Sequence, residues 1–558
     1  MEKNQEFVVA IEDMNEDGAG VGRVDGYIWF VKDTVMGDVV RAKAMKMKKT
    51  YGFARLMEVL EPSPGRAEPL CPVAKQCGGC QLQAMSYEEQ LRFKERKVLN
   101  NLLRIGKFSR DEIEMLPIIG MEKPWRYRNK AQFPFGENKE GEIITGFYAG
   151  RTHNIIENED CLLGVEENRE ILGIIKRFMK ENGLRPYSEK EHKGLVRHAL
   201  IRKGFRTGEL MVCLVINGER LPKKERLAEL LLQVKGMTSI SYSMNREKTN
   251  VIMGKEIVDI YGLGYITDYI GAVKYQISPL SFYQVNPDQT EKLYRTALEF
   301  AELTGDEVAW DLYCGIGTIS LFLAQRAKMV YGVELVTEAI RDAKKNAEIN
   351  GIRNVEFFVG RAEEVLLEEY EKNGLYADVI VLDPPRKGCD ELCLNTILKM
   401  GPKRVVYISC NSATLSRDLR YLADGGYRIE RVRCCDMFPG TYHVETVVLL
   451  SHKKPDGHIN VKVEFGEGEG KVPLDNIAKR AETYKPKERV TYKMIKEYIE
   501  AKYGFKVHTA YIAEVKRDLG LPMYDAPNAV EELKQPRKHP TPEKVEAIKD
   551  ALKHFEVI

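Results

Sequence analysis

One block near the middle of the chain limits the possible fold more than any other feature of the sequence. Residues 308–320 read Val-Ala-Trp-Asp-Leu-Tyr-Cys-Gly-Ile-Gly-Thr-Ile-Ser, an apolar strand that runs through an acidic residue into a glycine-rich turn and a helix. Glycines in such a turn let the backbone approach a ligand with no Cβ in the way. Ser320 stands where a dinucleotide fingerprint has its third glycine, which argues against NAD. The block predicts the first βα unit of a parallel sheet with a ligand at its edge.

Three more apolar stretches follow at the spacing of βα units, and each ends in polar residues. They are 329–333 before Glu334, 355–359 before Gly360, and 377–382 before Asp383. In open α/β sheets the ligand lies beyond the carboxyl ends of the strands, where these residues meet. A carboxylate such as Glu334, about 20 residues after the glycine-rich turn, is placed to accept hydrogen bonds from a ribose. These signals predict a Rossmann-like domain over residues 280–452 that binds an adenosyl ligand, and they argue against an α/β domain without one.

A fifth expected strand, 404–409, delivers Cys410 to the same edge as Asp383. Cysteine is often only a small buried apolar residue. Cys410 stands between Ser409 and Asn411 at a strand end, however, and these polar neighbours favour a nucleophile. A nucleophilic thiol has to ionise near neutral pH, so we expect a lowered pKa for Cys410.

A partner base for this thiol is expected just before the last apolar strand, in residues 443–450. Glu445 is the candidate, and His443 competes with it. Side chains two residues apart on a strand point to the same face, so the spacing does not choose between them.

A separate cluster of cysteines lies nearer the N-terminus. Cys71, Cys77 and Cys80 fall within ten residues of glycine-rich sequence, and Cys161 is the best candidate for a fourth ligand. Four thiolates suit either tetrahedral zinc or an iron–sulfur cluster, and their spacing does not decide between the two. The alternative is that these are unrelated buried thiols, and the close spacing of the first three cysteines argues against it.

The chain of 558 residues is too long for one hydrophobic core, and its composition divides it into four parts. We expect a small β-barrel at 1–62, a central α/β region at 66–275, the Rossmann-like domain at 280–452 and a C-terminal appendage at 453–558. The appendage shows a strand pattern at 459–465 and then two short helical patterns, a weak sign of a helix-turn-helix.

The composition also limits the cellular location and the partners that we expect for the chain. No apolar run approaches the roughly 20 residues of a membrane span, and the N-terminus has no apolar signal core, so we expect a cytoplasmic chain without membrane contact. The formal net charge of +2 does not by itself predict a nucleic-acid partner. Residues 125–130, Trp-Arg-Tyr-Arg-Asn-Lys, interleave aromatic and basic side chains, and we interpret them as an RNA contact rather than a solvated strand.

Five motifs together resemble one family, the RNA uracil-5-methyltransferases, and within it the 23S rRNA (uracil-5-)-methyltransferases. They are Phe-Tyr-Gln-Val-Asn at 282–286, Asp-Leu-Tyr-Cys-Gly at 311–315, Asp-Pro-Pro-Arg at 383–386, Ser-Cys-Asn at 409–411 and His-Val-Glu-Thr at 443–446. The resemblance covers the chain from its N-terminus to about residue 452 and leaves the C-terminal part uncovered. It implies a class I methyltransferase fold and a TRAM domain, a small RNA-binding barrel, at residues 1–62.

The resemblance also implies roles for particular residues. Cys410 is expected as the nucleophile and Glu445 as the base that removes a proton. By resemblance, the residues expected to contact S-adenosylmethionine are Gln284, Tyr313, Glu334 and Asp383. The glycine-rich turn itself adds Gly315 and Gly317 to these cofactor candidates. The family implies a 4Fe-4S cluster on Cys71, Cys77, Cys80 and Cys161, with zinc as the alternative, in a structural or RNA-positioning role.

The implied chemistry explains why a thiol is needed. Carbon-5 of uracil is a poor nucleophile, and adding a thiolate to carbon-6 creates an enolate that can take the methyl group. The target uracil would have to leave the stack of neighbouring bases to reach Cys410, so we expect base flipping. Arg386, where amino-methylating enzymes carry an aromatic residue, argues against adenine or cytosine amino groups as targets. Ser412 departs from the proline that the family commonly has at this position.

Two other functions remain open on the sequence alone. A tRNA uracil-5-methyltransferase is the nearest alternative, and the expected barrel and cysteine cluster favour the 23S rRNA enzyme over it by resemblance. A catalytically silent RNA-binding protein is the second alternative, and the intact Cys410, Glu445 and glycine-rich turn argue against it. No obligate protein partner is evident.

Overall fold

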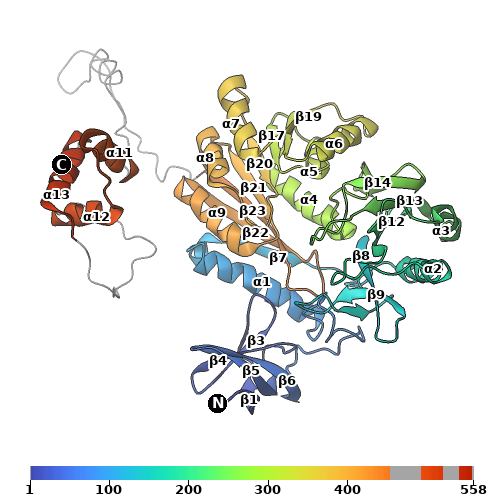
Figure 1. The fold of residues 1–558 in the computed structure, drawn as a ribbon. Helices are drawn as coiled ribbons and strands as arrows, with labels where there is room; N and C mark the ends of the chain where they lie inside the picture. The colour runs from blue at the N-terminus through green and yellow to red at the C-terminus, as the bar shows by residue number, and fades with distance from the viewer. Residues whose placement is uncertain (1, 453–491, 520–538, 556–558) are drawn as a thin grey trace. The chain divides into compact units, whose positions relative to one another are not determined.

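The computed structural model describes residues 2–452, 492–519 and 539–555 of the chain (Figure 1). The chain divides into two compact units, residues 1–456 and residues 457–558. The strand expected at 459–465 lies outside the described residues.

The N-terminal segment is a six-stranded sheet in the order β1-β5-β6-β4-β3-β2. Its strands are β1 Glu6–Ala10, β2 Asp13–Met14, β3 Gly20–Val24, β4 Tyr27–Val31, β5 Val39–Met47 and β6 Tyr51–Glu61. The sheet curls until β3 approaches β1, and a Cβ on Gly22 would lie 2.3 Å from the carbonyl oxygen of Ala10. Trp29 is fully buried at its centre, and Gly52 is needed opposite it because a Cβ there would lie 2.4 Å from the indole ring.

A second sheet of seven strands forms the centre of the first unit, in the order β10-β9-β8-β11-β12-β13-β14. Its strands are β8 Lys130–Glu137, β9 Ile143–Tyr148, β10 Ile155–Glu157, β11 Val196–Lys203, β12 Leu210–Ile216, β13 Met237–Met244 and β14 Glu256–Tyr261. Helices α2 (Glu167–Glu181) and α3 (Lys224–Leu231) bury their apolar faces against one side of it. A hairpin of β15 (Ile266–Ile270) and β16 (Val273–Ile277) leads on to the third sheet.

The third sheet has eight strands in the order β19-β18-β17-β20-β21-β23-β22-β7 (Figure 1). Its strands are β17 Val308–Leu312, β18 Met329–Glu334, β19 Val355–Val359, β20 Val379–Leu382, β21 Arg404–Ser409, β22 Tyr427–Cys435, β23 Glu445–His452 and β7 Met115–Ile119. The first five of these strands run parallel, and β23 lies antiparallel between β21 and β22. Parallel strands buried on both faces are near-continuous apolar runs, as Val379–Leu382 is.

Helices cover both faces of this sheet. Helices α4 (Pro287–Ala301), α5 (Thr318–Leu323) and α6 (Thr337–Ile349) pack in one apolar core. Helices α7 (Ala362–Asn373), α8 (Glu391–Met400) and α9 (Ser412–Asp424) pack in the other, and α1 (Tyr87–Arg104) joins them there. The two helical layers around a parallel sheet confirm the expected Rossmann-like α/β class.

Two elements from the range 66–275 belong physically to this third sheet. Strand β7 pairs in parallel with β22 at its edge, and helix α1 contributes Val98 and Leu102 to the same core as α8 and α9. Hydrophobic periodicity carries no information on which distant sheet a short strand joins.

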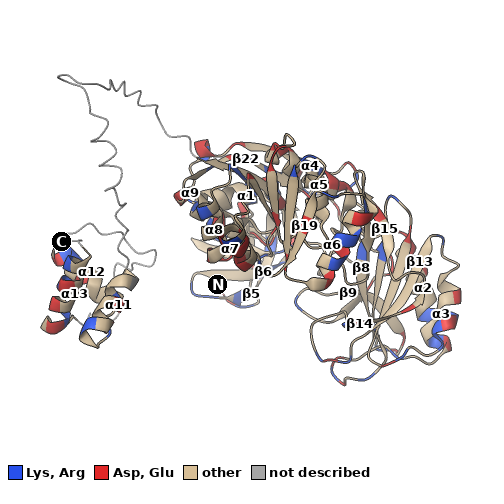
Figure 2. Ribbon diagram, turned by 90° about the horizontal axis from the view of Figure 1, so that it is seen from above, with Lys and Arg blue, Asp and Glu red and all other residues tan. Residues whose placement is uncertain are grey.

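The C-terminal unit holds three described helices, α11 Tyr492–Tyr503, α12 Thr509–Asp518 and α13 Pro542–His554. Their apolar faces meet in one small core that includes Ile495, Ile512 and Ile548. Both signs of charge lie on their outer faces (Figure 2). The helix-turn-helix assignment of this unit stays a prediction. In the described parts of the chain, no helix is both long and apolar enough to cross a membrane.

Candidate active site

The carboxyl ends of the parallel strands bring the expected polar residues to one rim of the third sheet. Asp311 is the last residue but one of β17, Glu334 ends β18, Asp383 follows β20 and Cys410 follows β21. The antiparallel register of β21 and β23 pairs Ser409 with Thr446, so the next pair along the two strands is Cys410 and Glu445. The thiol and the carboxylate are therefore neighbours, although 35 positions separate them in the chain.

The Cys410 thiol is half-buried between opposing charges. Burial raises its pKa to about 11, and the Glu445 and Asp383 carboxylates add to this, while the Arg386 guanidinium opposes it by charge and by a hydrogen bond. The expectation of a lowered thiol pKa is wrong for the protein without ligands. The sequence placed Cys410 beside polar residues, but it did not show that two buried carboxyl groups face the thiol. A substrate and a cation bound at the rim would have to offset that effect.

Asn411 fixes the position of this thiol. It caps α9, with its side-chain oxygen 3.0 Å from the backbone nitrogen of Ala413. Its side-chain nitrogen donates to the Arg386 carbonyl at 3.2 Å, which ties the loop after β20 to the loop after β21. Ser412, the first residue of α9, is buried and accepts a hydrogen bond from Asn101 of α1 at 2.9 Å. This hydrogen bond explains why a serine suits this position.

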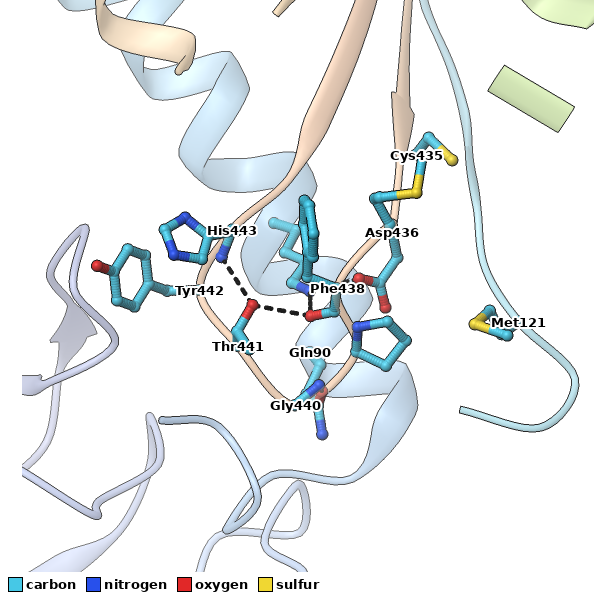
Figure 3. A network of polar contacts seen from close by, with 12 residues as sticks. Gln90, Met121, Cys435, Asp436, Phe438, Gly440, Thr441, Tyr442 and His443 are labelled. Carbon is cyan, nitrogen blue, oxygen red and sulfur yellow. Dashed lines mark hydrogen bonds and ion pairs between the residues drawn. The ribbon is translucent and has the colours of Figure 1, made fainter. Parts of the chain in front are cut away.

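The two candidate bases differ sharply in basicity. Burial and the Asp383 charge raise the pKa of the Glu445 carboxyl to about 8, against the opposing effect of Arg386. Burial and the positive charges of Arg386, Lys97 and others lower the pKa of His443 to about 4. Glu445 is the stronger base near neutral pH and opens β23, whereas His443 lies in the preceding loop (Figure 3).

The glycine-rich turn between β17 and α5 has the backbone that close approach of a ligand requires. Gly315 and Gly317 have φ values of 56° and 81°, and Tyr313 has a φ of 72° although it is not glycine. The Gly315 backbone nitrogen donates to Glu334 at 3.2 Å, and that of Val336 donates to the other Glu334 oxygen at 2.9 Å. These bonds hold the turn against the end of β18 and orient the Glu334 carboxylate.

Two buried carboxyl groups at this rim suit a positively charged ligand. Burial raises the pKa of Asp311 to about 7 despite a 2.5 Å hydrogen bond from Ser320, and burial together with Asp311 raises that of Asp383 to about 7. The second oxygen of Asp311 is buried and has no hydrogen-bond partner among the described residues. A sulfonium or amino group placed here would restore the ionised carboxylates.

The remaining cofactor candidates, Gln284 and Tyr313, are held by contacts within the protein. Gln284 is nearly buried in the segment before α4, where its carbonyl accepts a hydrogen bond from Asn129 at 2.9 Å. The Tyr313 hydroxyl interacts with the buried Cys393 thiol on α8, and burial keeps its pKa well above the usual value. Sequence reasoning had assigned no site role to Asp311 and no contact with the nucleophile to Arg386. Asp311 lies one residue before the end of an apolar strand and Arg386 lies in the loop after another, and these positions could have identified both.

The four cysteines expected as ligands lie near one another, because charges on Cys71, Cys77 and Cys161 each influence the Cys80 thiol. Burial raises the pKa of Cys80 to about 12. Within residues 2–452, 492–519 and 539–555, however, no three His, Cys, Asp or Glu side chains are placed to share a metal ion. The thiols are neighbours without ligating geometry.

The aromatic and basic segment 125–130 is largely committed to internal contacts. Tyr127 is buried and donates to the Pro439 carbonyl at 3.0 Å, Asn129 is buried, and Arg126 pairs with Asp160 at 2.6 Å. The expected RNA contact is therefore wrong for Tyr127, whose side chain is buried inside the protein. The members with partly exposed side chains are Trp125, Arg126, Arg128 and Lys130.

Comparison with known proteins agrees with this geometry. Residues 245–453 match the family described as tRNA (uracil-5-)-methyltransferase, and residues 2–57 match the TRAM domain. A protein of Halalkalibacterium halodurans described as an uncharacterized RNA methyltransferase is 53% identical over 452 residues, 81% of this chain and 98% of the relative. A Bacillus cereus protein with the same description is 50% identical over 81% of this chain and 97% of its own length.

A solved structure supports the same assignment. The Pyrococcus abyssi tRNA (uracil-54, C5)-methyltransferase in complex with S-adenosyl-L-homocysteine is 29% identical and superposes with a TM-score of 0.64. The match covers 80% of this chain and 100% of the archaeal one. The rim of the third sheet, the TRAM match and these relatives lead to one conclusion: the chain belongs to the S-adenosylmethionine-dependent RNA (uracil-5-)-methyltransferase family.

Proposed function

We propose that the chain methylates carbon-5 of a specific uridine in 23S rRNA, with Cys410 as nucleophile and Glu445 as base. The Cys410 thiolate adds to carbon-6 of the flipped-out uracil, and the electron pair of the 5,6 double bond moves into an enolate. Carbon-5 then attacks the methyl group of the S-adenosylmethionine sulfonium; the bond between sulfur and methyl breaks, its electron pair stays on sulfur, and S-adenosylhomocysteine leaves. Glu445 removes the carbon-5 proton, the double bond re-forms and the thiolate leaves.

The observation that carries this proposal is the pairing of a half-buried thiol with a fully buried, basic carboxylate at the rim where an adenosyl ligand binds in such folds. Arg386 stands beside both groups and can stabilise the thiolate or the enolate oxygen. A buried carboxyl group with a raised pKa is suited to accept a proton near neutral pH.

We assign the cofactor contacts to six residues at the rim. Glu334 would accept the ribose hydroxyls, and Asp383 would lie beside the charged end of the ligand. Gly315 and Gly317 provide the close backbone approach, and Gln284 and Tyr313 complete the set. Asp311, with its unpartnered oxygen, joins this set as a residue that the structure adds.

Two RNA substrates fit the family, and one experiment separates them. The TRAM match supports RNA as the partner, and by resemblance we favour 23S rRNA; the archaeal neighbour named for tRNA keeps tRNA uridine as the second candidate. Deleting the gene should remove 5-methyluridine from a defined position of 23S rRNA, and the purified protein should restore it there. Loss confined to tRNA would support the second candidate, and no loss in either RNA would contradict both.

We also propose that Cys71, Cys77, Cys80 and Cys161 hold a 4Fe-4S cluster with a structural or RNA-positioning role. A four-thiol donor set suits such a cluster or zinc, and the four thiols lie close enough for the charges of the other three to act on Cys80. Anaerobic reconstitution should give iron, sulfide and visible absorption. Stoichiometric zinc without that absorption would refute the cluster. The methyl transfer needs no redox step from it.

The division into domains at 1–62, 66–275, 280–452 and 453–558 is retained as a proposal, with α1 and β7 joined to the third of these parts. The TRAM match at 2–57 falls within the first.

A further inference from the structure

Helix α1 presents one polar face to the catalytic site, although it comes from a distant part of the chain. Tyr87, Gln90, Lys94, Lys97 and Asn101 recur at steps of three and four residues, so they share one side of the helix. We call these five residues the polar face of α1. Ser86 caps the helix, and apolar residues on a different side, Val98 and Leu102, fix it in the core of the third sheet.

Four members of the polar face hold the loop between β22 and β23, which carries His443 and ends at Glu445. Figure 3 shows this loop from Asp436 to His443, with Gln90 of α1 beside it. Lys94 forms an ion pair with Asp436 at 2.5 Å, and both side chains are fully buried. Its ammonium group also donates to the Phe438 carbonyl at 3.0 Å, and Tyr87 donates to the second Asp436 oxygen at 2.9 Å.

The same face follows the loop to its far end. The Gln90 side chain accepts a hydrogen bond from the Gly440 backbone nitrogen at 2.9 Å, and Lys97 donates to the Tyr442 carbonyl at 3.3 Å. Within the loop, Thr441 accepts from the His443 backbone nitrogen and donates to the Phe438 carbonyl (Figure 3). The loop is therefore anchored at intervals of two residues up to the start of β23.

The fifth member reaches the other half of the site. Asn101 donates to the Ser412 hydroxyl at 2.9 Å, at the first turn of α9 and two residues after Cys410. One rigid helix thus contacts the segment that carries the nucleophile and the segment that carries the base.

We propose that the polar face of α1, with the buried Lys94–Asp436 pair at its centre, is a positioning element that sets Glu445 against Cys410 and the bound uracil. A buried ion pair stabilises a fold little more than a well-packed apolar pair would, but it fixes one arrangement of the groups around it. Lys94 and Asp436 touch neither substrate nor cofactor in this account; they act through the loop. The proposal rests on the proposed role of Glu445 as base.

The test measures the step that Glu445 serves. A misplaced base slows proton removal from carbon-5 but leaves thiol addition and methyl transfer, so the methylated RNA should stay bonded to the protein. Full-length Lys94→Met should show a turnover about 100-fold lower, since a shift of about 1 Å at a catalytic group can cost that much. The KM for S-adenosylmethionine should stay within about threefold of wild type, because no cofactor contact changes. A denaturant-resistant adduct with ordinary, unfluorinated RNA should accumulate.

Matched variants make the result decisive. Arg92→Met removes a cation from the exposed side of the same helix, where its side chain is 72% exposed, and should leave turnover and adduct as in wild type. Lys94→Met/Asp436→Asn removes both buried charges, so it should fold even where the single variant does not, and it should still turn over slowly with accumulated adduct. Glu445→Gln provides the reference adduct.

Two outcomes would overturn the proposal. One is a double variant that turns over within about threefold of wild type. The other is a folded variant that loses turnover without adduct while Glu445→Gln accumulates it. If Glu445→Gln itself gives no adduct, the base assignment fails instead, and turnover of the double variant alone then decides the role of α1.

Discussion

Replacing Cys410 by alanine should abolish methylation of RNA, lowering the rate at saturating substrate by at least about a thousandfold. The reason is that carbon-5 of uracil becomes nucleophilic only after the thiolate has added to carbon-6. The alanine leaves the rim of the sheet, the Asn411 cap and the Arg386 loop in place. Binding of S-adenosylmethionine, measured by calorimetry, should therefore change little while transfer of a labelled methyl group is lost.

A control separates this effect from a general loss of a thiol. Cys213 is also buried, but it lies on β12 of the central sheet and not at the end of a strand of the third sheet. Cys213→Ala should keep turnover close to that of wild type. A Cys410→Ala protein that still methylates uridine would remove the covalent mechanism.

Replacing Glu445 by glutamine should lower turnover by about 10²- to 10⁴-fold, the range for loss of a general base. Glutamine keeps the shape of the side chain but accepts no proton. Methyl transfer precedes this step, so a single round of transfer should survive, and the methylated RNA should remain bonded to Cys410. The measurement is a denaturing gel of the reaction with labelled RNA, compared with multiple-turnover kinetics.

The rate of product release should also depend on pH in a defined direction. The Glu445 carboxyl accepts a proton only when ionised, and its pKa is raised to about 8, so release of the product should accelerate as pH rises from 6 towards 9. Glu445→Gln should lose that rise in the release step. His443→Gln is the matched control; with a pKa lowered to about 4, this imidazole is a weak base, and its loss should cost less than tenfold, roughly. A larger loss at His443 than at Glu445 would reverse the assignment.

The sequence predicted which residues meet at the rim of the third sheet, because each of them is marked by the short strand next to it in the chain. Asp383 and Cys410 each follow a short apolar strand, and parallel strands place such residues at one edge whatever surrounds them. The choice between His443 and Glu445 was beyond the sequence, because it depends on burial and on the charges of Arg386 and Asp383, which come from other loops.

Long-range contacts account for the other differences. The hydrophobic pattern of the sequence does not predict that β7 pairs with β22, or that Lys94 forms an ion pair with Asp436, 342 positions away. The thiol pKa was expected low from its strand-end position, and the two facing carboxyl groups raise it instead. Tyr127 belongs to the segment expected to contact RNA, but its hydroxyl donates a hydrogen bond to the Pro439 carbonyl inside the protein.

Mass spectrometry of the protein trapped on 5-fluorouridine RNA tests the central claim most directly. Fluorine at carbon-5 leaves no proton for Glu445 to remove, so the adduct should persist and, after digestion, a methylated fluorouridine should be found on the peptide that contains Cys410. A nucleotide bonded to any other residue, or complete methylation of ordinary RNA by a protein that never forms the adduct, would contradict the account.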